Sequence, residues 1–324
     1  MTYNLKNILI TGAYGFVGTN LANHLFEQNN QYHLAALDLH NQSKAVYSKY
    51  YSWEDYDAID WDDYHAIIHL AGKAHDTTSS SDPDSYFEIN FELTKLVFSS
   101  FLKSNANTFI FFSSVKAVTD SVLSDSLLEA SIPNPLTPYG QSKLAAEKFI
   151  LAQEVPASKY VYILRPAMIH GPGNKGNLNL LFSMVQRGIP YPLGAFENQR
   201  SFTAMGNMLF IVSNLISKNI ESGIYNICDD EPISTLEIVK MIYKSLGKKD
   251  KILNIPKSVI KKIAIAGDAL KLPLNSERLK KMTESYLVSN RKIKNALSVS
   301  ALPTDAYTGM LQTINNFKKN NTTT

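Results

Sequence analysis

Residues 8–18 read Ile8-Leu9-Ile10-Thr11-Gly12-Ala13-Tyr14-Gly15-Phe16-Val17-Gly18, an apolar run that leads into three regularly spaced glycines. Apolar residues then recur at helical spacing up to Gln28, which predicts a strand, a tight turn and a helix. A dinucleotide binds at such a turn: Gly12 permits the turn, Gly15 lets the backbone approach a pyrophosphate, and Gly18 lets the helix pack on the strand. The first N–H groups of the helix then face the phosphates. The residues expected to contact this cofactor are Gly12, Tyr14, Gly15, Phe16, Val17 and Gly18.

Glycines at this spacing also suit a plain turn between a strand and a helix, so the next acidic residue decides between the two interpretations. A second apolar run, His33 to Leu37, ends in Asp38, which lies twenty residues after Gly18. A carboxylate at this place accepts both ribose hydroxyls and repels a 2′-phosphate. The predicted cofactor is therefore NAD rather than NADP.

The composition describes a globular protein: the chain has 324 residues and is 44% hydrophobic. Its single cysteine, Cys228, excludes an intramolecular disulfide and multi-cysteine metal sites, so we expect no metal and a reducing compartment. The first strand is predicted within a few residues of Met1, and no apolar run approaches the roughly 20 residues that span a bilayer. These features predict a cytoplasmic, soluble protein without a signal peptide or stable membrane insertion.

The net charge of +3 is too small to indicate nucleic-acid binding, but it is unevenly distributed. Residues 240–294 hold fifteen lysines or arginines against four acidic residues. Solvated helix faces are the simplest interpretation of this excess. Attraction of an anionic substrate and loose association with an anionic membrane surface are the alternatives.

Apolar runs alternate with helical patterns over the first half of the chain, which predicts an α/β fold of the Rossmann type, a doubly wound parallel sheet. The predicted strands are 8–10, 33–37, 66–70, 108–112 and 160–164, and the predicted helices include 85–104 and 139–153. After Arg165-Pro166, glycines and prolines interrupt the pattern. We expect an NAD-binding domain at 1–170 and a smaller, mainly substrate-binding region at 171–324 that is partly interleaved with the sheet.

The acidic and aromatic stretch 50–63 should hold a further strand and an adenine contact at Glu54 or Asp55.

Tyr139 and Lys143 lie four residues apart on a predicted helix, so their side chains share a face. A phenol has a pKa of about 10, but an adjacent ammonium and a positive nicotinamide would lower it and make Tyr139 a general base. Lys143 would also hold the nicotinamide ribose. Ser114 follows the strand 108–112 at the carboxyl edge of the sheet, where its hydroxyl can bond a reacting oxygen. A Tyr-x-x-x-Lys pair alone is common on helix surfaces, but together with the glycine turn and Asp38 it indicates hydride-transfer chemistry.

These motifs resemble the extended short-chain dehydrogenase/reductases, the NAD-dependent epimerase/dehydratase family, over the chain up to about residue 315. Two branches are most similar: the UDP-glucose 4-epimerases, and the reductases of UDP-4-keto-6-deoxy-N-acetylhexosamines in surface-polysaccharide synthesis. The residues that carry the resemblance are 11–18, Asp38, 69–72, Asn90, Ser113-Ser114, 138–143, Arg165-Pro166 and 171–173.

The resemblance implies roles for further residues. Its cofactor contacts add Leu70, Ala71, Gly72, Asn90, Ser113, Tyr139, Lys143, Arg165 and Pro166, and its substrate contacts are Ser114, Val115, Asn177 and Arg200. Asn177 would touch the nucleotide diphosphate and Arg200 would pair with a phosphate, with a surface arginine in a turn as the alternative interpretation of Arg200. His69, His75 and Asn90 are interpreted mainly as structural. The family also implies a homodimer through two helices per subunit.

One departure from the family narrows the reaction. Sugar 4,6-dehydratases usually follow the catalytic serine or threonine with an Asp-Glu pair, and here Val115 and Lys116 stand at those positions. We therefore expect no dehydratase. The first hypothesis is an NAD-dependent 4-epimerase of a UDP-hexose or UDP-N-acetylhexosamine, and Asp38 favours it because cellular NAD is mostly oxidised. The second is a reductase of a nucleotide-linked 4-keto sugar, and the third is a non-catalytic NAD-binding module.

Overall fold

Seven parallel strands form the central sheet in the computed structural model, which describes residues 5–28, 31–73, 82–122, 125–270 and 275–322. The strand order is β3-β2-β1-β4-β5-β6-β9, and every neighbouring pair is parallel. The strands are β1 (Lys6–Thr11), β2 (Tyr32–Leu37), β3 (Lys49–Tyr51), β4 (Ala66–His69), β5 (Thr108–Phe112), β6 (Tyr160–Pro166) and β9 (Gly223–Ile227). The chain adds β2 and β3 on one side of β1 and then β4 on its other side, so the order in which strands are added reverses there. This order confirms the predicted Rossmann-type doubly wound fold.

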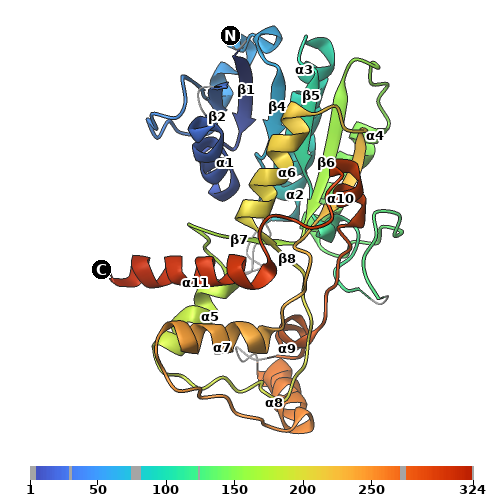
Figure 1. Ribbon diagram of the computed structural model, residues 1–324. Coiled ribbons are helices and arrows are strands. Elements are labelled where there is room, and N and C mark those ends of the chain that lie inside the picture. The colour runs from blue at the N-terminus through green and yellow to red at the C-terminus, as the bar shows by residue number, and fades with distance from the viewer. Residues whose placement is uncertain (1–4, 29–30, 74–81, 123–124, 271–274, 323–324) are drawn as a thin grey trace.

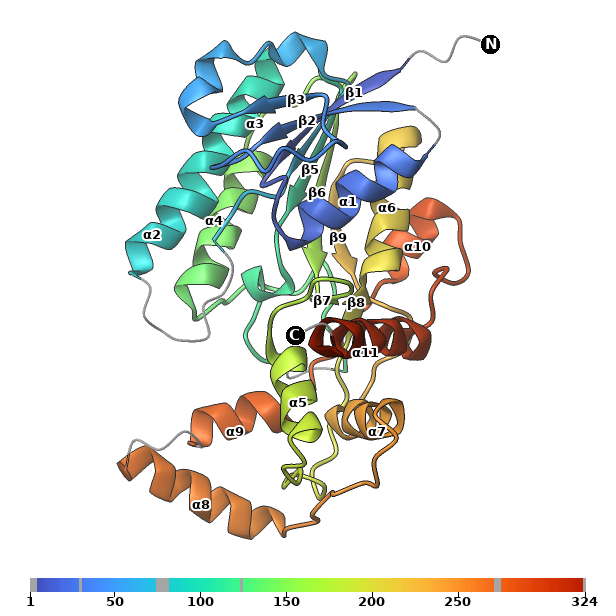
Figure 2. The same cartoon turned by 90° about the vertical axis from the view of Figure 1, so that its left-hand side faces the viewer.

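Helices cover both faces of this sheet, as Figures 1 and 2 show. On one face pack α1 (Phe16–Glu27), α6 (Met205–Ser217) and α10 (Arg291–Leu297). On the other face pack α3 (Leu93–Lys103) and α4 (Pro138–Leu151). Because both faces are covered, the central strands are continuous apolar runs rather than alternating ones.

The predicted helix 85–104 is interrupted in the structure. Its parts are α2 (Pro83–Phe87), a π-helical turn η3 (Glu88–Glu92) and α3. Asn90 lies in this wider turn and is fully buried, because its side chain bonds the backbone of Lys73 and the hydroxyl of Ser142. Such turns are frequent at functional sites, and apolar spacing alone does not reveal the extra residue per turn.

The stretch 50–63 holds less strand than aromatic content suggests. Strand β3 ends at Tyr51, and two 3₁₀ helices follow, η1 (Trp53–Ala58) and η2 (Trp61–Asp63). The carboxylate of Asp55 accepts hydrogen bonds from the backbone N–H and hydroxyl of Ser52, so it caps η1.

The chain beyond residue 171 builds a second core and also returns to the first. The second core contains α5 (Asn177–Gln186), α7 (Thr235–Ser245), α8 (Lys257–Leu270), α9 (Ser276–Thr283) and α11 (Ala306–Thr322). A small parallel sheet of β7 (Met168–His170) and β8 (Phe202–Ala204) lies between the two cores in Figure 1. Strand β9 belongs to the large sheet, and α6 and α10 pack on it, so residues 171–324 are not a separate contiguous unit. Across the described stretches, no helix is both long and apolar enough to cross a bilayer.

The aromatic packing between α3 and the sheet gives a test of this arrangement. Phe98 is fully buried and its ring lies edge-on to Phe109 of β5, with the ring centres 5.0 Å apart. We expect Phe98→Ala to lower the free energy of unfolding by about 3–5 kcal/mol in urea denaturation. Leu96→Ala, on the same helix but 46% exposed, should cost about 0.5 kcal/mol or less. Equal losses in the two variants would contradict the packing described.

Candidate active site

The glycine turn after β1 is shaped by close backbone contacts. Gly12 has a φ of +65°, and a Cβ built there would lie 2.7 Å from the backbone nitrogen of Ala71. A Cβ at Gly18 would lie 2.5 Å from the carbonyl oxygen of Gly12. Gly12 is therefore required by the close approach of the loop after β4, and Gly18 by the close packing of α1 on the turn.

Asp38 is held at the carboxyl end of β2, beside this turn. One of its carboxylate oxygens accepts a hydrogen bond from the N–H of Tyr14 (2.8 Å) and the other from Leu39 (2.7 Å). Each oxygen keeps further acceptor capacity. Helix α1 starts after Gly15 without a side-chain cap, so the N–H groups of its first turn remain for an anion. The turn, the uncapped helix start and the fixed carboxylate fit the pyrophosphate and ribose of a dinucleotide.

His69 at the end of β4 helps to hold the same turn in place through hydrogen bonds. Its ring nitrogens bond the hydroxyls of Thr11 (2.7 Å) and Thr94 (3.0 Å), and Thr11 in turn accepts from the N–H of Ala71. Complete burial lowers the pKa of His69 to about 3, with the charge of Lys143 adding to the effect. His69 is thus neutral at physiological pH and acts as a structural link between β1, β4 and α3.

Ser114, Tyr139 and Lys143 come from two elements that meet at the carboxyl edge of the sheet. Helix α4 begins with Pro138 after Thr137, whose hydroxyl caps the N–H of Gly140 at 3.3 Å. Its first turn presents Tyr139 to Ser114, and the two side chains are hydrogen-bonded. One turn later the buried amine of Lys143 donates to the carbonyl of Phe112, 2.9 Å away. The structure therefore brings the three predicted catalytic side chains to one place.

The pKa of Tyr139 differs from the sequence-based expectation. Burial raises it, and the hydrogen bond to Ser114 opposes the rise. The expected lowering relied on the Lys143 ammonium and on a positive nicotinamide. In the structure that amine bonds a backbone carbonyl, and burial lowers its own pKa to about 8. The described residues around Tyr139 therefore do not lower its pKa below the ordinary value.

Glu147, which the sequence analysis overlooked, supports this edge. It lies one turn beyond Lys143 on α4, is buried, and pairs with Arg165 of β6, with 2.5 Å between Nη2 and Oε2. The hydroxyl of Ser113 also donates to Glu147. The spacing 139, 143, 147 follows one helix face and could have pointed to Glu147. Arg165, expected at the cofactor, is engaged in this buried pair.

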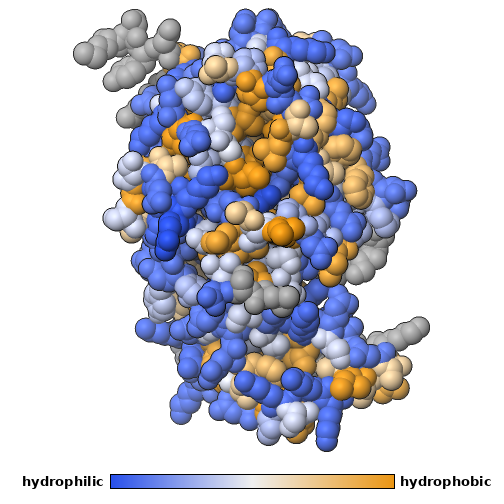
Figure 3. Space-filling model, turned by 90° about the vertical axis from the view of Figure 1, so that its right-hand side faces the viewer, coloured by the Kyte–Doolittle hydropathy of each residue, from blue (hydrophilic) through white to orange (hydrophobic). Residues whose placement is uncertain are grey.

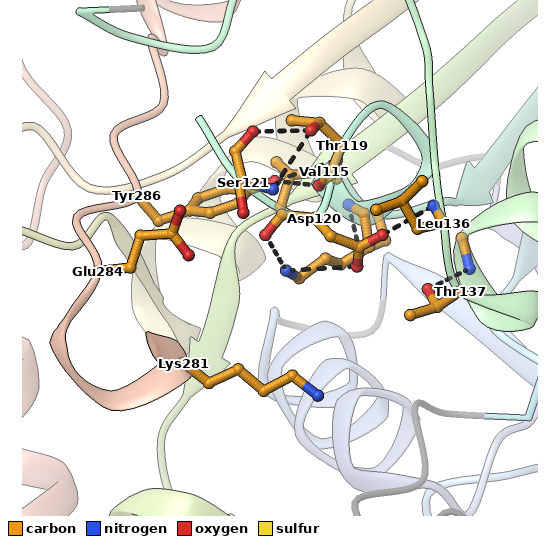
Figure 4. A network of polar contacts seen from close by, with 12 residues as sticks. Val115, Thr119, Asp120, Ser121, Leu136, Thr137, Lys281, Glu284 and Tyr286 are labelled. Carbon is orange, nitrogen blue, oxygen red and sulfur yellow. Dashed lines mark hydrogen bonds and ion pairs between the residues drawn. The ribbon is translucent and has the colours of Figure 1, made fainter. Parts of the chain in front are cut away.

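A polar network surrounds the loop that follows Ser114 (Figure 4). The hydroxyl of Ser114 accepts from the N–H of Lys116 at 3.1 Å, and the amine of Lys116 donates to the carbonyl of Asp120 at 2.9 Å. Tyr286 donates to the carbonyls of Val115 and Thr119 at 3.3 and 2.8 Å. The network joins the loop after Ser114 to the C-terminal third of the chain.

Arg200 approaches this network from a neighbouring segment. Its Nη1 donates to the carbonyl of Lys281 at 2.6 Å, and its backbone pairs with Ile233 and Tyr286. Burial lowers the pKa of Arg200, whereas the charge of Glu284 opposes this. Arg200 is also close enough to Lys116 to lower the pKa of that amine, after the larger effect of burial. Two of the predicted substrate residues, Arg200 and Ser114, thus lie around one loop.

Other predicted site residues are placed differently. Val115 is buried in an apolar cluster with Val118, Tyr286 and Val288, and Pro166 is buried in β6. Asn177 is exposed on the first turn of α5, and no contact recorded among the described residues joins it to the catalytic side chains. Its contact with a diphosphate remains a prediction. His75 lies outside the described residues.

Gly72 and Asn90 lie beside Lys143. A Cβ at Gly72 would lie 2.8 Å from the Asn90 amide oxygen and 3.1 Å from the Lys143 amine. The described residues contain no cluster of three or more His, Cys, Asp or Glu side chains arranged to hold a metal ion.

Comparisons with known proteins agree with this arrangement. The model of the NAD dependent epimerase/dehydratase family matches residues 8–228. The chain is 29% identical over 260 residues to the UDP-glucose 4-epimerase of Vibrio cholerae, covering 78% of this chain and 79% of that protein. It is 26% identical over 257 residues to the N-acetyl-alpha-D-glucosaminyl-diphospho-ditrans,octacis-undecaprenol 4-epimerase of Escherichia coli O157:H7, covering 77% and 75% of the two chains.

Among solved structures, the chain is similar to the UDP-glucuronic acid 4-epimerase of Bacillus cereus in complex with NAD. The TM-score is 0.74 at 20% identity, and the alignment covers 97% of this chain and 99% of that one. At this identity the likeness concerns the fold.

The buried Lys143 gives a pH-dependent test. Its pKa of about 8 lies below the ordinary 10.5, so between these values the folded protein has released a proton that the unfolded chain retains. The contribution of Lys143 to the free energy of unfolding therefore rises with pH across this window, by at most about 1.4 kcal/mol per pH unit. Below pH 8 both states are protonated and the contribution is constant.

Urea unfolding of the wild type and Lys143→Met from pH 7 to 10 measures this contribution. We expect the wild type to gain stability relative to the variant above pH 8. Lys148→Met, which changes an exposed lysine on the same helix, is the matched control. A constant difference between wild type and Lys143→Met up to pH 10 would contradict the lowered pKa.

Proposed function

The chain belongs to the NAD-dependent epimerase/dehydratase family of enzymes, and from this premise we propose that it inverts C4 of a UDP-linked hexose or N-acetylhexosamine through a transient 4-keto sugar. The observation that carries the proposal is the Ser114–Tyr139 hydrogen bond beside the buried amine of Lys143, at the sheet edge next to the glycine turn. A redox sensor would not require these three groups together.

We propose that the cofactor lies along the carboxyl edge of the sheet, beside the glycine turn. The glycine turn and α1 would hold the pyrophosphate, Asp38 the adenine ribose, and Lys143 the nicotinamide ribose. When bound, NAD would accept the hydride from C4 of the sugar and later return it to the same carbon.

The chain's own residues handle the proton and the orientation of the sugar. Tyr139 takes the proton of the 4-hydroxyl, and the Ser114 hydroxyl bonds the same oxygen and fixes its position. Arg200 would pair with a phosphate of the substrate, because a guanidinium matches phosphate geometry bidentately. Rotation of the 4-keto sugar presents its other face, and Tyr139 then gives the proton back to the oxygen at C4.

A reductase of a nucleotide-linked 4-keto sugar is the second candidate, since it uses the same three groups in one direction. The Val115–Lys116 pair after Ser114 favours it, because this pair resembles the corresponding turn of some such reductases. The carrier of the sugar is a further variable. The Escherichia coli relative acts, by its name, on a polyprenyl-diphosphate sugar, and both carriers would offer Arg200 a diphosphate.

We also propose a homodimer through α4 and a neighbouring helix. Exposed apolar side chains on this side of the molecule include Leu96 of α3 and Leu151 of α4, 46% and 56% exposed.

A panel of sugars separates epimerase from reductase. UDP-galactose, UDP-N-acetylgalactosamine, a UDP-4-keto sugar and a polyprenyl-diphosphate N-acetylglucosamine would each be incubated with and without NADH, and products followed by chromatography and NADH by absorbance. We expect interconversion of 4-epimers with no net change in NADH. Consumption of one NADH per sugar would overturn the epimerase in favour of the reductase.

Tyr139→Phe tests whether the protein is catalytic. The variant keeps the ring but loses the proton-accepting oxygen, so we expect the rate to fall by about 10²–10⁴-fold while NAD binding, measured by calorimetry, persists. Tyr160→Phe, at the opposite, amino-terminal end of β6, is the matched control and should keep its rate. Unchanged turnover in Tyr139→Phe would exclude the proposed mechanism.

A further inference from the structure

Helix α8 carries an apolar stripe that no part of the described protein covers. The helix buries Ile260, Ala264 and Gly267 against the second core. An adjacent stripe faces outward at the spacing i, i+4, i+7, i+11, which places its members in one row along the helix. This outer stripe consists of Val259 (44% exposed), Ile263 (46%), Ala266 (exposed) and Leu270 (68%). Figure 3 shows apolar surface among hydrophilic side chains at this lower end of the molecule.

The two helices at this end of the molecule carry an excess of positive charge. Helices α8 and α9, which pack on each other, carry six basic side chains against two acidic ones. The basic residues are Lys257, Lys261, Lys262, Arg278, Lys280 and Lys281. Of the acidic residues, Asp268 accepts hydrogen bonds from Ser276 and Glu277 pairs with Lys281 at 2.6 Å. Six of the fifteen basic residues noted in the sequence therefore lie on the helix with the exposed apolar row and on its neighbour.

The combination selects among possible occupants. Aliphatic side chains in a row with neighbouring lysines are typical of helices that lie in the interface of an anionic bilayer, where the lysine stems also contribute apolar surface. A second copy of the same face would bring two cationic surfaces together, and like charges across an interface are unfavourable. The charge thus favours an anionic lipid surface over self-association.

The outer stripe is connected to the candidate active site through α9. The carbonyl of Lys281 accepts the 2.6 Å hydrogen bond from Arg200, and Tyr286, shortly after α9, holds the loop that follows Ser114. Figures 1 and 2 place α8 and α9 together at the end of the molecule away from the large sheet. One two-helix unit therefore reaches from the exposed face to the segments around the proposed substrate.

We propose that α8 docks the protein on an anionic lipid bilayer, lying along its surface with the outer stripe in the headgroup region and Lys262, which flanks the stripe, beside the phosphates. The docking is peripheral and reversible, since a single short helix face contributes it. The proposal concerns where the enzyme works and holds for either candidate reaction.

Vesicle co-sedimentation of the full chain tests the proposal. The protein would be mixed with vesicles of phosphatidylcholine alone or with 30% phosphatidylglycerol, about that fraction being enough to give a strongly negative surface, at low and high salt. We expect binding to the anionic vesicles only, and its loss at high salt because the attraction is screened. Absence of binding to the anionic vesicles at low salt would overturn the proposal.

Variants locate the binding face. Lys262→Gln should weaken partitioning roughly fivefold, and Ile263→Ser with Leu270→Ser at least about tenfold. The matched controls are Lys103→Gln for charge, and Phe26→Ser for an exposed apolar residue elsewhere. All of these side chains are exposed, and thermal unfolding would verify that each variant is folded.

Two results would assign the face otherwise. Binding that persists in both α8 variants would place the lipid contact on another surface and overturn the proposal. Light scattering would measure the oligomeric state of the wild type and of Ile263→Ser with Leu270→Ser. If the wild type does not bind vesicles and the variant changes its oligomeric state, the outer stripe is an interface between copies of this chain.

Discussion

The buried pair of Glu147 and Arg165 is the interaction on which the candidate site depends. It joins α4 to β6, and through Ser113 it also holds the end of β5. Ser114 follows Ser113 directly, and Tyr139 and Lys143 precede Glu147 on the same face of α4. A buried charge without its partner is strongly unfavourable. The pair therefore fixes the rotation of α4 about its axis and the position of the loop after β5 relative to α4. The hydroxyl and the phenol therefore meet without depending on any ligand.

A second buried polar system organises the cofactor side. Thr11, His69 and Thr94 link β1, β4 and α3, while Asn90 ties the loop after Gly72 to α4. Each of these groups is satisfied by side chain or backbone partners, which makes the arrangement rigid. The π-helical turn at 88–92 is the local distortion that lets Asn90 reach both partners. Rigid support of this kind gives the site beside the glycine turn a fixed shape.

The C-terminal third has two tasks that its interleaved path makes compatible. Strand β9 completes the large sheet, and helices α6 and α10 pack on one of its faces. Between these returns, the chain sends out α7, α8 and α9, and the segment after α9 comes back to the catalytic loop through Tyr286. A short series of direct contacts thus links α9 to the loop after Ser114.

Local sequence determined the alternating strands and helices, the turn around Gly12, and the helix face shared by Tyr139 and Lys143, because these features follow from residue periodicity and from backbone geometry that only glycine tolerates. The tertiary structure alone decided that Arg165 is paired with Glu147, that Val115 faces an apolar cluster, and that burial raises the pKa of Tyr139. It also decided that α6, β9 and α10 return to the first sheet and that the helix predicted at 85–104 contains a π-turn. Each of these depends on partners far apart along the chain, and the energy of a buried charge or a burial-shifted proton is set by those partners rather than by neighbouring residues.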